Sequence, residues 1–108
     1  MPRRGHQAVA AAGGHRDAAS STLATVLAPV SACAGVPQGA GFSEKLNRAA
    51  YTAGGLVAAG HLTADQARAA LLAAAVHARP GQERRALQII RSGMRAGDRH
   101  PLELGART

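Results

Sequence analysis

The segment from Thr63 to Ala78 carries a clear helix-start signature followed by an almost uninterrupted run of alanine and leucine. Its first four residues, Thr-Ala-Asp-Gln, have the form of a capping box, in which the threonine and glutamine side chains each accept a backbone N–H of the first turn. Alanine has the highest intrinsic helix propensity. The segment therefore predicts a helix to about Ala78, broken by Arg79-Pro80-Gly81.

Two further helices are predicted on either side of this one. The first runs from Ser43, its expected N-cap, to about Ala59, and Gly60 ends it. The Gly54-Gly55 pair inside it predicts close approach of another helix. The last helix runs from about Gln82 to Ala96, with Gly97 as its stop. Its apolar arc consists of Ala86, Ile89, Ile90, Gly93 and Met94.

The apolar content of the chain is unusual, because 46% of its 108 residues are hydrophobic but most of these are alanine, and only 2% are aromatic. Such a chain predicts thin, closely packed helices with a small core. We expect an all-α fold: a small three-helix bundle, or four helices if a short one forms near residues 20–35, where Pro29 would stop or kink it. The predicted organisation is a mostly disordered Ala/Gly-rich arm at 1–41, a helical domain at 42–101 and a tail at 102–108.

The charge balance is strongly basic, with 13 Lys+Arg against six Asp+Glu and a net charge of +7. This balance favours polyanionic partners, although a GC-rich genome would also raise the arginine content. The placement of the arginines is more informative than their number, because Arg84, Arg91 and Arg95 fall on one side of the last predicted helix, opposite its apolar arc. Guanidinium groups without competing carboxylates suit phosphate binding, and a solvated outer face is the alternative interpretation. The predicted nucleic-acid-binding residues are Arg84, Arg91, Arg95, Arg85, Arg48 and Asn47.

The sequence offers no catalytic apparatus. The five histidines lack metal-ligand spacing, the carboxylates occur singly, and there is no phosphate-binding loop or nucleophile elbow. We therefore expect no enzyme activity, no metal, no cofactor and no small-molecule substrate. No run of 18 uncharged apolar residues occurs, so we expect no membrane contact and a cytoplasmic location.

The order of several short strings resembles one known module. Leu46-Asn47-Arg48-Ala49-Ala50-Tyr51, then Leu56-Val57-Ala58-Ala59-Gly60, then Ile90-Arg91-Ser92-Gly93-Met94-Arg95-Ala96-Gly97 are similar to the helical C-terminal module of bifunctional DNA primase/polymerase proteins. The resemblance covers about 60 residues. It implies a non-catalytic accessory role in DNA replication, with DNA and a replication protein such as a primase or helicase as partners.

The chain departs from that pattern in ways that bear on function. Phe42-Ser43 stands where the family has an Arg-Asn pair, and Ile89 stands where it has threonine. The family's polymerase domain has no counterpart in the 41 residues before the module. The chain is therefore expected to be a detached, truncated or degenerate copy.

Two alternatives remain open at this point. The helical unit could be a protein-interaction module or a gene remnant without function. The string Val30-Ser31-Ala32-Cys33 also has the form of a lipoprotein cleavage box, which would make residues 1–32 a signal peptide.

Overall fold

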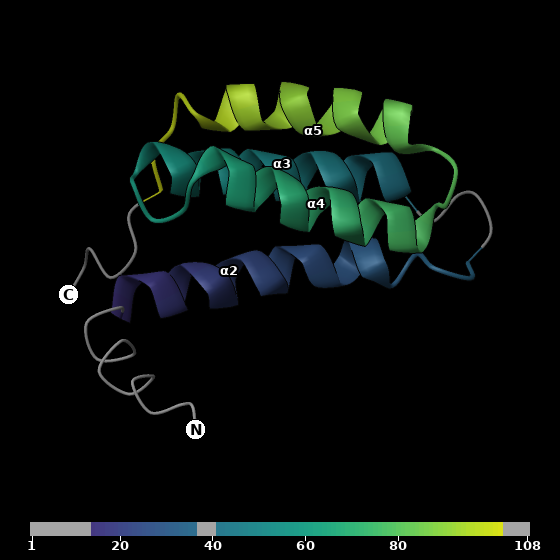
Figure 1. The fold of residues 1–108 in the computed structure, drawn as a ribbon, viewed down its shortest axis with the longest axis horizontal. Helices are drawn as coiled ribbons and strands as arrows, with labels where there is room; N and C mark the ends of the chain where they lie inside the picture. The colour runs from purple at the N-terminus through teal and green to yellow at the C-terminus, as the bar shows by residue number, and fades with distance from the viewer. Residues whose placement is uncertain (1–13, 37–40, 103–108) are drawn as a thin grey trace.

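The computed structural model describes residues 14–36 and 41–102. These residues form four helices and no strands: α2 (Gly14–Ser31), α3 (Phe42–Ala58), α4 (Ala64–Ala78) and α5 (Glu83–Gly97) (Figure 1). The predicted all-α class is confirmed. The remaining parts of the predicted arm and tail, residues 1–13, 37–40 and 103–108, lie outside the described residues.

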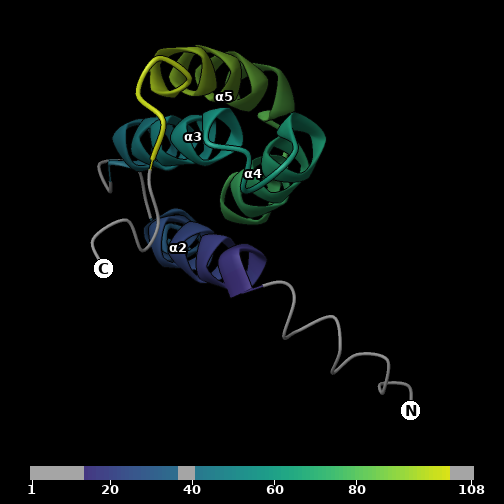
Figure 2. The same cartoon turned by 90° about the vertical axis from the view of Figure 1, so that its left-hand side faces the viewer.

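The four helices are stacked in three layers. The middle layer is formed by α3 and α4, with α5 on one side and α2 on the other (Figure 2). Both middle helices contact each other and both outer helices, whereas α2 and α5 do not contact each other. The most extensive contact is between α3 and α5, and it determines which face of α5 remains exposed.

Helix α2 belongs to the bundle and overlaps the region near residues 20–35, where the sequence allowed a short helix within a mostly disordered arm. Ala19, Leu23 and Val30 are buried, and Cys33 is 1% exposed in the turn that follows. The helix continues through Pro29, which lacks the N–H for one hydrogen bond of the ladder, and ends two residues later at Ser31. The helical domain therefore begins well before residue 42.

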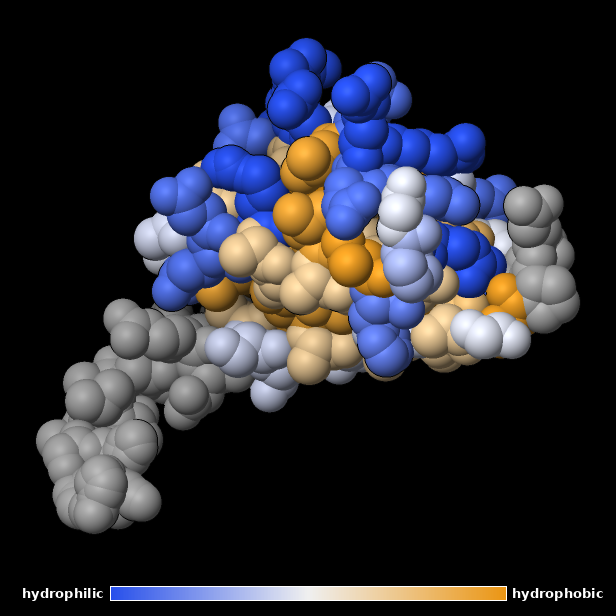
Figure 3. Space-filling model, turned by 45° about the vertical axis from the view of Figure 1, so that its right-hand side comes forward, coloured by the Kyte–Doolittle hydropathy of each residue, from blue (hydrophilic) through white to orange (hydrophobic). Residues whose placement is uncertain are grey.

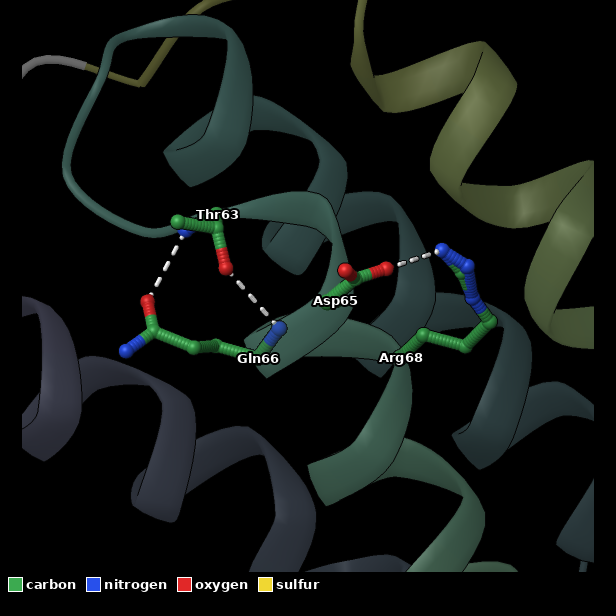
Figure 4. Close-up of polar contacts among 4 residues, drawn as sticks. All are labelled: Thr63, Asp65, Gln66 and Arg68. Atoms are coloured by element: carbon green, nitrogen blue, oxygen red, sulfur yellow. Dashed lines mark hydrogen bonds and ion pairs between the residues drawn. The ribbon is translucent and has the colours of Figure 1, made fainter.

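Two predicted helix ends are confirmed. The Thr63 hydroxyl accepts the Gln66 N–H at 3.0 Å, and the Gln66 side chain accepts the Thr63 N–H at 2.9 Å, so the capping box is complete (Figure 4). At the end of α3, Gly60 has φ +84°. Its N–H donates to Val57 O, and the next N–H, of His61, donates to Leu56 O. This is a Schellman motif, which requires a residue such as glycine at the left-handed position.

Two other predicted helix ends are wrong. Ser43 is not the N-cap of α3, because the helix begins at Phe42 after Gly41, which has φ 74°. Phe42 is buried in the core, so tertiary packing moves the N-cap two residues earlier, from Ser43 to Gly41. Gly97 does not stop α5 in a left-handed conformation; it is the last residue of the helix and is buried.

Gly54 and Gly97 lie where the backbones of α3 and α5 touch. A β-carbon on Gly54 would collide with the Met94 carbonyl, and one on Gly97 would collide with the Tyr51 carbonyl. Both positions therefore require the absence of a side chain. The predicted close approach at the Gly54-Gly55 pair is confirmed.

Two further close contacts lie along α3, one with α5 and one with the chain after it. A β-carbon on Gly93 would lie 2.6 Å from the Ala50 β-carbon. After α5, the chain folds back over α3, where the Leu102 N–H donates to Gly55 O at 2.9 Å and a β-carbon on Gly55 would lie 2.9 Å from His100 O. Small residues thus let α3 and α5 pack closely along most of their length.

We predict that Gly97→Ala destabilises the protein. Alanine is favoured over glycine in a helix by up to about 1 kcal/mol, but overpacking a tight contact costs about 1–3 kcal/mol. The obstructing atom is a backbone carbonyl, which cannot rotate away, so we expect a net loss of about 1–2 kcal/mol in the free energy of unfolding. Urea unfolding followed by circular dichroism measures it. Ser92→Ala, on the exposed side of α5, should change it by less than about 0.5 kcal/mol; a more stable Gly97→Ala protein would contradict the close contact.

Candidate nucleic-acid interface

Helix α5 places the predicted arginine stripe on the outside of the bundle. Its buried side consists of Ala86, Ile90, Gly93 and Gly97, which face α3. The opposite side carries Arg84, Arg91 and Arg95, all exposed. At 1.5 Å per residue, these three span roughly 16 Å, which equals the rise of about five base pairs at 3.4 Å per step.

No hydrogen bond or ion pair holds any of the three stripe arginines within residues 14–36 and 41–102. The ion pair found there joins Arg68 to Asp65 on α4, at 2.9 Å. The guanidinium groups of Arg84, Arg91 and Arg95 therefore keep their donors available for an anion. This is the property that phosphate binding requires.

The other predicted binding residues are distributed around this stripe. Arg85 lies on one flank, where its Nη2 donates to the Ser43 hydroxyl at 3.0 Å. Asn47 lies at the seam between α3 and α5, with its Oδ1 close to Gly93. Arg48 is exposed but lies one residue, about 100°, further around α3 and away from α5. The structure therefore brings Arg85 and Asn47 near the stripe and leaves Arg48 apart from it.

The Arg79 side chain is held by contacts within the fold. Its Nη1 donates to Cys33 O at 2.7 Å and to Ala78 O at 3.0 Å, and its guanidinium carbon lies 5.2 Å from the centre of the Phe42 ring. A cation is favourable beside the carbonyl of the last residue of α4 and a carbonyl just after the end of α2, and its position over the ring adds a cation–π interaction. Arg79 thus ties the end of α2, the start of α3 and the end of α4 together.

Sequence reasoning did not anticipate a groove between α4 and α5, beside the arginine stripe. The groove has a volume of about 350 Å³. Its larger apolar lining residues are Val57 on α3 and Leu87, Ile90 and Met94 on α5, of which Ile90 is almost completely buried. Leu87 was absent from the predicted apolar arc. The sequence feature that could have revealed the groove is a large apolar residue only about 60° from the arginine stripe on the helical wheel. Figure 3 shows apolar surface bordered by hydrophilic side chains on this side of the molecule.

The rim of the groove is basic on both sides. Arg91 and Arg95 rise from α5, and Arg68 rises from α4. Figure 4 shows the Arg68 side chain, held by Asp65, on the side of α4 that faces α5. Asp98 is the carboxylate that also lines the groove.

Other kinds of site find no support in the described part of the chain. No group of three or more histidine, cysteine or carboxylate side chains there could hold a metal ion. None of the helices is long and apolar enough to cross a membrane.

No family model, curated protein or solved structure matches the chain.

We predict that Arg79 and the stripe arginines differ in their effect on stability. Arg79→Gln should lower the free energy of unfolding by about 1–2 kcal/mol, because it loses two charge-assisted hydrogen bonds from one nitrogen and a cation–π contact at a partly exposed site. Arg84→Gln should change it by less than about 0.5 kcal/mol, because Arg84 has no partner in the described structure. Thermal and urea unfolding of both variants provides the comparison. Equal losses would show that the stripe is itself structural.

Proposed function

We propose that this protein is a non-catalytic helical module that binds the phosphate backbone of DNA through Arg84, Arg91 and Arg95 on α5. The observation that carries the proposal is the row of three exposed guanidinium groups with no partner in the described structure. Arg85 lies at the edge of this surface and supplements it. Arg48 is less suitable, because it points away from α5.

The chemistry of the surface favours backbone contact over base reading. Guanidinium groups bind phosphate through paired N–H donors and carry no sequence information when they do so. No phenylalanine, tyrosine or tryptophan lies in α5, so stacking on single-stranded bases has no platform there. The module should therefore bind duplex DNA with little sequence preference.

A role in DNA replication, beside a primase, polymerase or helicase, is supported by the resemblance of the strings from Leu46 to Gly97 to the helical module of primase/polymerase proteins. This role would place the protein in the cytoplasm. On this proposal the module docks next to DNA while a separate protein performs the chemistry, with no cofactor of its own.

The burial of Cys33 weighs against the lipoprotein alternative. Its Sγ donates to Pro29 O at 3.5 Å, and the side chain is 1% exposed within the core. Cleavage before Cys33 would also remove Ala19, Leu23 and Val30 from the core. Loss of these contacts would destabilise a domain with few large apolar side chains.

Fluorescence anisotropy with a labelled duplex, measured across a salt series, tests the proposed function. We expect the triple variant Arg84→Gln/Arg91→Gln/Arg95→Gln to bind more weakly at low salt. The slope of log K against log salt should become shallower by about 2.7, because each phosphate contact contributes about 0.9.

The matched comparison removes two charges at each place: Arg91→Gln/Arg95→Gln from the stripe and Lys45→Gln/Arg48→Gln from α3. If the stripe is the interface, the α3 variant retains most of the affinity, whereas a non-specific effect of net charge weakens both double variants equally. Wild-type protein that fails to bind at low salt, or a stripe variant that binds like wild type, would overturn the proposal.

A further inference from the structure

We propose that the groove between α4 and α5 is a docking site for an acidic amphipathic helix of a protein partner. The groove combines an apolar floor with a basic rim on both sides, and this combination matches a helix with an apolar face bordered by carboxylates. The site is distinct from the exposed arginine stripe, although Arg91 and Arg95 belong to both.

The floor of the groove keeps part of its apolar surface uncovered by the fold. Val57 and Met94 are partly buried against the core, and Ile90 is almost completely buried beneath them. Leu87 is half-buried and lies outside the group of partly buried side chains that pack on the core. Covering this surface would release water from aliphatic groups, which favours association. Met94 is suited to such a surface because its flexible thioether side chain adapts to different partners.

The shape of the groove fits a helix. It extends along α5 from Leu87 to Asp98, roughly 16 Å at 1.5 Å per residue, and its α4 wall consists of Ala64 and Arg68 near the start of that helix. Its floor lies over the side of α3 that carries Gly54 and Val57. A partner helix there would pack on α4 and α5 as another member of the bundle. Its volume of about 350 Å³ is at the lower end of the range for small-molecule sites, and it is partly open to solvent. An elongated occupant with side chains that enter the groove therefore fits better than a compact ligand.

The charges of the rim select an acidic occupant. Arg68 on one side and Arg91 and Arg95 on the other can form paired hydrogen bonds with carboxylates that flank an apolar stripe. Asp65 neutralises part of Arg68, and Asp98 is the remaining carboxylate of the groove. A second copy of this chain, with a net charge of +7, would bring like charges together. Duplex DNA presents phosphates and base edges, with its base faces stacked inside, so it offers no apolar face to cover Leu87 and Val57.

The test uses the full chain and a synthetic helical peptide of about 15 residues, with leucine at i, i+4, i+7 and i+11 and glutamate on both flanks. Anisotropy of the labelled peptide measures affinity, and backbone NMR shifts of the wild-type protein locate the contact. We expect saturable binding with shifts centred on Val57, Leu87 and Met94. A peptide with lysine in place of glutamate should not bind.

Leu87→Gln and Ile89→Gln form the decisive pair of variants. Both residues are half-buried aliphatic side chains of α5, but Leu87 faces the groove and Ile89 lies on the opposite flank. Leu87→Gln should weaken peptide binding at least about tenfold, and Ile89→Gln should leave it within about twofold. Arg68→Gln, which lies off the α5 stripe, should weaken it about threefold to tenfold.

The results separate this proposal from the proposed function. Leu87→Gln should bind DNA like wild type, since Leu87 offers no phosphate contact. If the peptide binds and DNA does not, the docking site stands and the DNA proposal falls. No saturable binding of the acidic peptide, equal binding of the lysine peptide, or NMR shifts outside the groove would overturn the docking proposal, whatever DNA does.

Discussion

The backbone contact between α3 and α5 is the interaction on which the rest of the structure depends. Gly54, Gly93 and Gly97 permit it, because each lies against a backbone or β-carbon atom of the opposite helix. A chain whose apolar residues are mostly alanine cannot fill a wide space between helices. Close approach removes that space instead, so dispersion contacts between backbones replace the large side chains that the sequence lacks.

The same contact positions the basic surface. Because the glycine side of α5 faces α3, the arginines on its opposite side must face solvent. Because α4 lies beside α3 and only partly against α5, a groove remains between α4 and α5 in which Leu87 stays half-exposed. The exposed stripe and the groove are therefore two consequences of one packing arrangement, and they share Arg91 and Arg95 while differing in the chemistry that they offer.

Arginine residues of similar appearance in the sequence have different roles in the fold. Arg79 caps carbonyl groups at the ends of two helices and lies over the Phe42 ring, so its charge is used within the protein. Arg85 is partly used, through the Ser43 hydroxyl, whereas Arg84 is not. The functional value of a guanidinium group depends on whether its donors are already satisfied, and this property belongs to the three-dimensional structure.

The sequence by itself determined the all-α class, the Thr63–Gln66 capping box, the Gly60 stop and the exposed side of α5. These features depend on local hydrogen bonding and on helical periodicity, both of which act within a few residues. Only the tertiary structure decided the features that depend on partners distant in sequence. Packing against α3 and α4 makes α2 part of the bundle, and burial of Phe42 begins α3 before Ser43. Gly97 is the last residue of α5 and lies against the Tyr51 carbonyl, where a side chain would not fit. The groove beside Leu87 belongs to this second group, because its walls come from three helices that only the fold brings together.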